Sequence, residues 1–273
     1  MCAGLLMAPT SRIGTGQPPS IATMSKFENH WSAAEIAGHA CEVFRPSKAN
    51  PHGFVVIYLH GVHQTSLRDK DPFNKNFEAH GLTVVAPRSG ATWWADRLTP
   101  HFDDRLTPQS FVRDKVMEFI ENEFDAVPPR VALLGTSMGG QGALRISYQY
   151  PDRFPIVAAL SPAIDYQIRI QEGDEILTEM YGDPERGRQD TALLHVFPLN
   201  WPRHQFFCCD PLDYRWFDSS DRLKMKLGSM GIPHETDLET SAGGHGFEYY
   251  NAMAERAVDF LADALERERL RIV

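Results

Sequence analysis

Hydrophobic positions along the chain form short continuous apolar runs, and the segments between them carry apolar residues at helical spacing. The runs have the length of buried strands. Alternating strands and helices predict an α/β fold with a mostly parallel central sheet and helices on both faces. The expected strands cover residues 54–59, 82–86, 131–134, 155–160 and 205–209, with a weaker candidate at 234–238.

Helical spacing is clearest at the C-terminus and in three earlier segments. Helices are expected at 72–80, after Thr107 as N-cap with Pro108 in the first turn, and at 141–150. Residues 165–203, rich in charge and proline, lie between two expected strands and are interpreted as a small cap insertion; the alternative is a long surface crossover with one or two helices. The last helix has an apolar face formed by Met253, Ala257, Phe260, Leu261, Ala264 and Leu265.

A G-x-S-x-G motif follows the strand at 131–134 and precedes the helix at 141–150. Strand, motif and helix in this order are typical of a nucleophile elbow, which places Ser137 at a sharp turn with its hydroxyl exposed. Gly135 and Gly139 supply the small residues that such a turn needs, because the strand and helix backbones pass close together. The alternative is a glycine-rich turn that only joins a strand to a helix.

A histidine and an acid are expected after the serine in the chain order Ser, Asp or Glu, His. His245 lies in a glycine-rich loop just before the last helix and is the candidate general base, although a solvent-facing loop histidine would look the same. The acid should follow the strand at 205–209. Spacing does not choose cleanly between Asp210 and Asp213. Asp213 is favoured and Asp210 is the main rival, since Asp210 before Pro211 equally suits a turn.

Other carboxylates and polar residues in this stretch are assigned to the following helix. Asp218 is placed near its start, and Ser219, Ser220 or Asp221 is expected to be its N-cap.

Two backbone amides are expected to form an oxyanion hole. One belongs to Met138, directly after the candidate nucleophile, and the other to Val62, which follows a His-Gly pair at the end of the strand at 54–59. His60 and His63 could instead be metal ligands, but two histidines three apart without a nearby carboxylate favour a structural role. The tentative substrate-pocket residues are Trp93, Trp94 and His60.

Composition narrows the context of the chain. Its 273 residues carry a net charge of −9 without a visible basic patch, which argues against nucleic-acid binding. No apolar stretch approaches the roughly 18 residues of a membrane span. Residues 1–25 are expected to be a disordered extension, with Met24 an alternative start, and residues 26–273 a single domain. The four cysteines do not form a disulfide framework, which favours a reducing cytoplasm; nothing indicates an oligomeric state.

Several segments resemble the esterase D-like branch of the α/β-hydrolases, which includes S-formylglutathione hydrolases, feruloyl-type esterases and mycolyltransferases. The resemblance extends from about Glu42 to the final helix. It implies ester hydrolysis through a serine acyl-enzyme and supports Ser137 and His245; residues 209–213 depart from the expected Gly-x-x-Asp form, so the choice of acid stays open. The matching segments are 58–61, 135–144, 150–154, 158–163 and 243–245.

The sequence therefore predicts a serine carboxylesterase that acts on small ester or thioester substrates and needs no metal or organic cofactor. Three alternatives use the same residues or fold: an acyltransferase, in which an alcohol replaces water; a small serine peptidase; and a non-catalytic binding protein. Intact Ser137 and His245 argue against the last of these.

Overall fold

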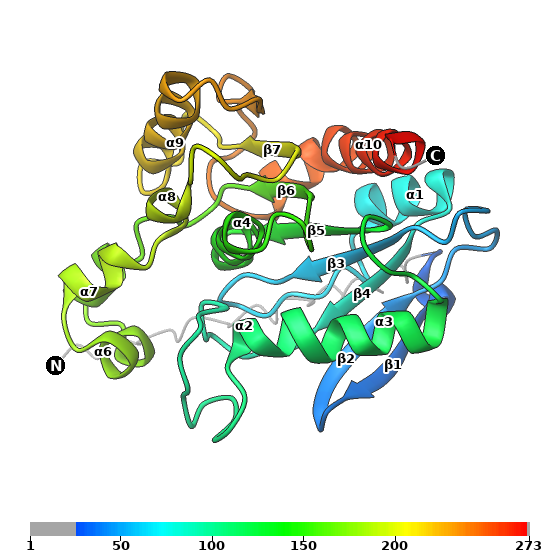
Figure 1. Cartoon of the computed structure of the whole chain (residues 1–273), viewed down its shortest axis with the longest axis horizontal. Helices are drawn as coiled ribbons and strands as arrows, with labels where there is room; N and C mark the ends of the chain where they lie inside the picture. The colour runs from blue at the N-terminus through cyan, green and yellow to red at the C-terminus, as the bar shows by residue number, and fades with distance from the viewer. Residues whose placement is uncertain (1–25, 272–273) are drawn as a thin grey trace, which may run out of the picture.

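An eight-stranded sheet forms the centre of the chain in the computed structural model, which describes residues 26–271 (Figure 1). The extension expected at residues 1–25 lies outside this range. The strand order is β1-β2-β4-β3-β5-β6-β7-β8; β2 is antiparallel to β1 and β4, and the other neighbours are parallel. All six expected strands are present. The strands are β1 (Trp31–Ile36), β2 (His39–Phe44), β3 (Val55–Leu59), β4 (Thr83–Pro87), β5 (Val131–Thr136), β6 (Ile156–Leu160), β7 (His204–Cys208) and β8 (Glu235–Asp237).

The hairpin β1–β2 was not expected from the sequence. Its turn is formed by Ala37 and Gly38, both with positive φ, as short hairpin loops require. In β1 only the two end residues, Trp31 and Ile36, are buried. An edge hairpin that buries so few side chains leaves only a weak hydrophobic pattern, which explains why the sequence did not reveal it.

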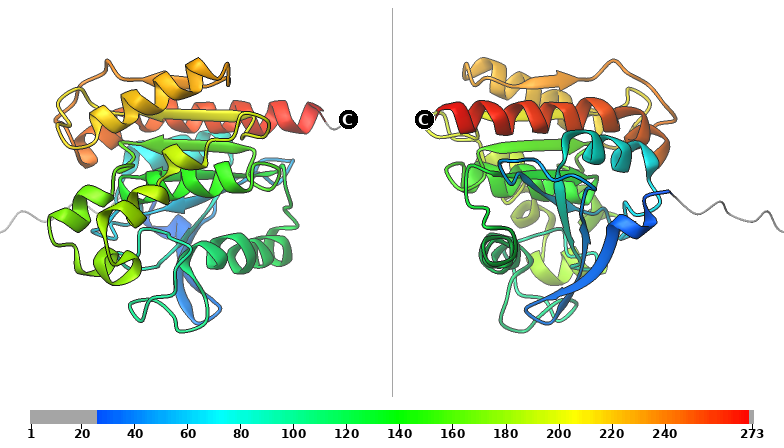
Figure 2. Two further views of the ribbon diagram at one scale, coloured as in Figure 1. Left: turned by 60° about the vertical axis from the view of Figure 1, so that its left-hand side comes forward. Right: turned by 90° about the vertical axis from the view of Figure 1, so that its right-hand side faces the viewer.

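Helices cover both faces of the sheet. Side chains along each strand point alternately to one face and to the other, so a buried hydrophobic layer forms on each face, between the sheet and its helices. In one layer α3, α4 and α9 pack on the sheet; in the other, α1 and α10 lie side by side (Figure 2). Cys208 and Cys209 are adjacent in sequence yet belong to opposite layers. The long helices are α1 (Asp71–His80), α3 (Met117–Phe124), α4 (Met138–Gln149), α9 (Phe217–Ser229) and α10 (Phe247–Arg271).

The helix predicted after Thr107 is confirmed in modified form. The Thr107 hydroxyl caps it, accepting a hydrogen bond from the amide of Ser110 at 3.0 Å. The helix begins as α2 (Pro108–Ser110), widens to a π-helical segment, η2 (Phe111–Val116), and continues as α3. A short 3-10 helix, η1 (Glu28–His30), precedes β1.

The predicted cap of α9 is wrong. The helix begins at Phe217, ahead of Ser219, Ser220 and Asp221, and has no side-chain cap. Its start is determined by a turn instead: the amide of Phe217 donates to the carbonyl oxygen of Asp213 at 3.0 Å. Ser219 and Ser220 are consequently buried in its first turns.

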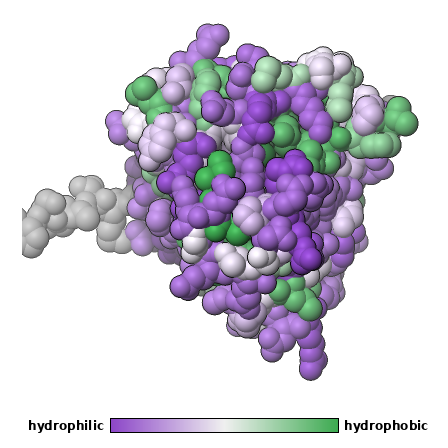
Figure 3. Space-filling model, turned by 90° about the vertical axis from the view of Figure 1, so that its left-hand side faces the viewer, coloured by the Kyte–Doolittle hydropathy of each residue, from purple (hydrophilic) through white to green (hydrophobic). Residues whose placement is uncertain are grey.

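Four short helices make up the segment expected to be a cap. They are α5 (Gln167–Gln171), α6 (Glu175–Tyr181), α7 (Pro184–Gln189) and α8 (Ala192–His195). They lie to one side of the sheet, where α8 packs against α4 (Figure 1). The molecular face on this side is mainly polar, with small separate apolar areas (Figure 3). Within residues 26–271, no helix is both long and apolar enough to cross a bilayer.

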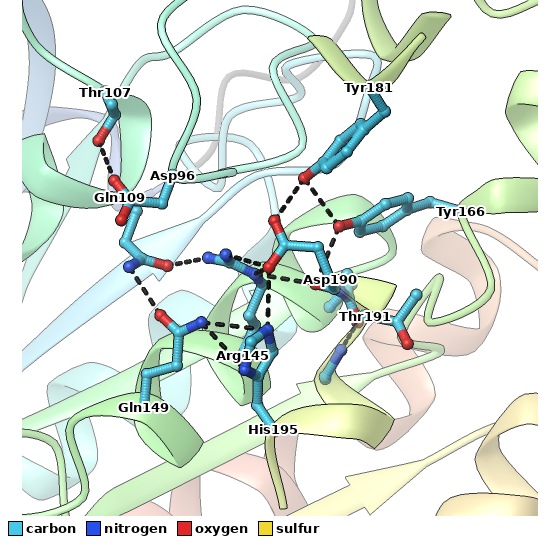
Figure 4. A network of polar contacts seen from close by, with 12 residues as sticks. Asp96, Thr107, Gln109, Arg145, Gln149, Tyr166, Tyr181, Asp190, Thr191 and His195 are labelled. Carbon is cyan, nitrogen blue, oxygen red and sulfur yellow. Dashed lines mark hydrogen bonds and ion pairs between the residues drawn. The ribbon is translucent and has the colours of Figure 1, made fainter. Parts of the chain in front are cut away.

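A buried polar network fastens this segment to α4 (Figure 4). Arg145 of α4 pairs with Asp190, its Nη2 lying 2.5 Å from Oδ1. Asp190 also accepts hydrogen bonds from the Tyr181 hydroxyl at 2.8 Å on Oδ2 and from the Tyr166 hydroxyl at 2.9 Å on its carbonyl oxygen. Burial alone would raise the pKa of Asp190, but the hydrogen bond with His195 and the charge of Arg145 outweigh it and lower the pKa to about 2.

Candidate active site

The turn between β5 and α4 holds Ser137 in a strained conformation. Its φ and ψ are 55° and −119°, a region that L-residues rarely occupy. The adjacent backbones are so close that a Cβ on Gly135 would lie 2.1 Å from the carbonyl oxygen of Gly139, and a Cβ on Gly139 would lie 1.9 Å from that of Leu59. Only glycine fits at these two positions, as the motif predicts.

A chain of hydrogen bonds links Ser137, His245 and Asp213. The serine Oγ is 2.9 Å from His245 Nε2, and His245 Nδ1 is 2.6 Å from Asp213 Oδ2. Asp213 is buried, with 1% of its side chain exposed. When Nδ1 donates its proton to the Asp213 carboxylate, Nε2 is free to accept the serine proton, which is the tautomer that a general base needs.

Asp210, the rival acid, is bonded not to the His245 ring but to the loop that carries it. Its carboxylate accepts hydrogen bonds from the Ser241 hydroxyl at 2.8 Å and from the amides of Ala242 at 2.6 Å and Gly244 at 2.9 Å. Burial raises the pKa of Asp210, and these hydrogen bonds together with the one from the Leu212 amide more than offset it, so the carboxyl group is ionised near neutral pH.

Met138 and Val62, the two residues expected to supply the oxyanion-hole amides, lie in segments next to Ser137. Met138 is the first residue of α4, and amides in a first helical turn have no partner within the helix. The loop with Val62 approaches from β3, where a Cβ added to Gly61 would lie 3.3 Å from the Ser137 Cβ. Gly61 and Val62 line the same cavity as Ser137.

The His60 ring holds the loop that contains Gly61 and Val62 through two hydrogen bonds. The Ser89 amide donates to His60 Nε2 at 3.2 Å, so Nδ1 carries the proton and donates to the Gly61 carbonyl oxygen at 2.8 Å. That carbonyl and the Val62 N–H belong to one peptide and point in opposite directions, so the hydrogen bond fixes where the amide points. Burial lowers the pKa of His60 to about 4, which keeps the ring neutral.

A cavity of about 420 Å³ opens above Ser137. Trp93 lines it as expected, but Trp94 and His60 do not. Trp94 turns into the core, where its Nε1 donates to the His60 carbonyl oxygen at 3.1 Å and its Cβ lies 2.5 Å from where a Cβ of Gly142 would be. Both tryptophans have positive φ, so the backbone turns here and the two side chains point in different directions. Other lining residues are Thr65, Arg169, Tyr214, Arg215, Trp216, Phe247 and Tyr250.

Tyr250, which was not expected at the site from the sequence, lies next to the proposed base His245. Its hydroxyl is 3.1 Å from His245 Nε2, and the side chain is buried. Burial, the largest influence, raises the pKa of Tyr250 well above the usual value, so the group stays a neutral hydrogen-bonding partner. The available signal was its place in the first turn of α10, five residues after His245.

Tyr250→Phe is expected to lower kcat about two- to tenfold, because a hydrogen bond that restrains His245 is lost while the shape is kept. The measurement is turnover of a p-nitrophenyl ester, together with the rate of labelling by a fluorophosphonate. Tyr249→Phe is the matched control, since Tyr249 is adjacent and buried in the core. Equal losses in the two variants would mean that Tyr250 acts only through packing.

Fold and site together define the class: an α/β-hydrolase fold with a serine, a histidine and an aspartate arranged as in serine hydrolases. Residues 36–207 match the model of the Esterase family, described as "Putative esterase", and the chain belongs to that family. The resemblance to esterase D-like proteins is thereby confirmed.

Curated relatives and solved structures agree with this assignment. The S-formylglutathione hydrolase of Bos taurus is 26% identical over 141 residues, which are 44% of this chain and 50% of that protein, so the match spans about half of the relative. An S-formylglutathione hydrolase structure from Agrobacterium tumefaciens superimposes with a TM-score of 0.67 at 18% identity, covering 89% of this chain and 93% of that one. MPT51 of Mycobacterium tuberculosis gives a TM-score of 0.66 at 16% identity, covering 85% and 98%. At these identities the structures show a shared fold.

Proposed function

We propose that this chain is a serine esterase that hydrolyses small carboxylic esters or thioesters. The observation that carries the proposal is the hydrogen-bonded chain of Ser137, His245 and Asp213 beside a cavity large enough for a small substrate. Membership of the Esterase family supports the same reaction class.

The proposed reaction has two stages. Ser137 attacks the ester carbonyl carbon while His245 takes its proton, and the amides of Val62 and Met138 stabilise the oxyanion. His245 then protonates the leaving alcohol or thiol, which leaves an acyl-enzyme. Water then attacks the acyl carbon while His245 takes its proton. When the ester bond to Ser137 breaks, His245 returns that proton to the serine oxygen and the acid is released. Asp213 holds the histidine tautomer and stabilises the imidazolium in both stages.

Ser137→Ala is expected to lower kcat for p-nitrophenyl acetate, butyrate and octanoate by a factor on the order of 10³ or more, and to abolish fluorophosphonate labelling. Ser161→Ala is the matched control: Ser161 also follows a parallel strand with positive φ and is buried, and its expected activity is that of the wild type. A wild-type chain that neither cleaves these esters nor takes up fluorophosphonate would contradict the proposal.

A further inference from the structure

Two arginines line the cavity that holds Ser137, although the chain as a whole is acidic. Arg169 belongs to α5 of the cap, and Arg215 lies in the turn after Asp213. From these positions we propose that the substrate carries a carboxylate, which Arg169 and Arg215 bind while Ser137 attacks its ester bond. The inference rests on the proposed esterase function and names the class of substrate.

A single glutamate brings the two guanidinium groups together. Glu172 Oε2 accepts a hydrogen bond from Arg169 Nη1 at 2.9 Å and another from Arg215 Nη1, also at 2.9 Å. One carboxylate thus serves two cations, and Asp174 Oδ2 lies farther away, 3.7 Å from Arg169 Nη2. Each guanidinium has five N–H donors, so most of them remain available to a ligand.

Hydrogen bonds hold the chain in place at Arg169 and around Arg215. The amide of Arg169 donates to the Tyr166 carbonyl oxygen at 2.9 Å, and the Tyr166 hydroxyl is bonded to Asp190 in the network that fastens the cap to α4. Arg215 lies between Asp213 and Trp216, whose amide donates to Asp213 Oδ1 at 3.2 Å. The backbones that carry the two cationic groups therefore belong to the same segments as the pocket wall and the proposed catalytic acid.

The cavity that the two arginines line also has aromatic side chains in its wall, Trp93 and Trp216 among them. The ring of Trp93 lies against those of Tyr166 and Trp216, with centroids 5.5 and 6.5 Å apart. Side-chain exposures of 33% for Arg169 and 32% for Arg215 leave both groups accessible but partly desolvated. Aromatic surface beside paired guanidinium groups suits an organic carboxylate, whose body packs on the rings while its oxygens accept hydrogen bonds from the arginines.

The carboxylate could belong to the acyl group or to the alcohol of the ester, and matched substrate pairs separate these sources. Mono-p-nitrophenyl adipate and p-nitrophenyl hexanoate differ by a carboxylate on the acyl side. The compounds 4-acetoxybenzoate and methyl 4-acetoxybenzoate differ by a carboxylate on the alcohol side. We expect the charged member of at least one pair to have the higher kcat/KM, and the pair in which it does identifies the source.

Arg169→Gln and Arg215→Gln are each expected to lower the charged-to-neutral ratio of kcat/KM ten- to a hundredfold, as removal of a charge-assisted hydrogen bond would. Arg186→Gln is the matched control, because it removes one positive charge from an exposed cap position outside the cavity and should leave the ratio unchanged. A loss that affects both members of a pair equally would indicate disturbed packing and would overturn the proposal. So would a wild-type ratio near one in both pairs.

Equilibrium binding separates this proposal from the esterase reaction itself. Calorimetry of the Ser137→Ala variant with 4-acetoxybenzoate and with its methyl ester measures the affinity for each compound in the absence of turnover. The difference between the two affinities reports binding of the carboxylate. For a carboxylate on the alcohol side, tighter binding of the acid is expected, and Arg215→Gln in the same background should weaken it at least tenfold. Monomethyl adipate and methyl hexanoate, which differ by a carboxylate on the acyl side, give the same reading for that side. Equal affinity within both pairs would overturn the carboxylate site even if ester hydrolysis is established, and unequal affinity would support it even if hydrolysis fails.

Discussion

Asp213→Asn is expected to lower kcat for a p-nitrophenyl ester by about 10⁴, with little change in melting temperature. The carboxylate that receives the His245 Nδ1 proton, at 2.6 Å, would become an amide that no longer enforces the tautomer or stabilises the imidazolium. The residue is buried beside the Cys209 thiol, at 3.6 Å, so an isosteric replacement is needed to keep the packing.

Asp210→Asn is the matched comparison, since the two aspartates are three residues apart and both are buried. An amide oxygen can keep some of the hydrogen bonds from Ser241, Ala242 and Gly244, so we expect the histidine loop to loosen and kcat to fall roughly ten- to a hundredfold, with a lower melting temperature. A 10⁴-fold loss in Asp210→Asn at unchanged melting temperature, with an active Asp213→Asn, would reverse the assignment of the acid.

Asp190→Asn is expected to lower the free energy of unfolding by about 3–5 kcal/mol, which corresponds to a fall in melting temperature of roughly 10 °C. The reason is the buried partner: the Arg145 side chain is only 3% exposed and would lose its counter-charge. Glu185→Gln in the same cap removes an ion pair with Arg188 that is largely exposed, and should leave the melting temperature close to that of the wild type. Thermal unfolding of both variants at neutral pH is the measurement.

Acid should reduce the difference between wild type and Asp190→Asn. Because the pKa of Asp190 is about 2 in the folded chain and 3.8 ordinarily, its ionised form contributes stability above pH 3.8, and the contribution disappears as the pH falls toward 2. The gap in melting temperature should therefore become smaller as the pH falls below 4. A gap that is independent of pH down to 2.5 would mean that the charge of Asp190 is not what stabilises the cap.

The parts of the fold that follow from local patterns were predictable. Continuous apolar runs identify buried parallel strands, and glycines two residues on either side of Ser137 identify the elbow, because both signals depend on residues close in sequence. The site was predictable where loops at the ends of parallel strands must meet, which brings His245 to Ser137.

Other parts depend on distances that the sequence does not contain. The choice between Asp213 and Asp210 is a matter of which carboxylate the β7–α9 turn directs at the histidine ring, and that turn is determined by hydrogen bonds from Trp216 and Phe217 to Asp213. Tyr250, Arg169 and Arg215 come from three separate segments, and only the folded chain places them around one cavity.

The two adjacent cysteines at the end of β7 provide separate probes of how the molecule opens. Burial raises the pKa of the Cys208 thiol to about 12 and raises that of Cys209 as well, so neither is a reactive thiolate while its surroundings are closed. Cys208 is covered by the α1–α10 layer and Cys209 by the layer with α4 and α9. Each thiol becomes reactive only when its own layer loosens. The rate of thiol labelling under native conditions, followed separately at Cys208 and at Cys209, would therefore report the opening of each layer independently.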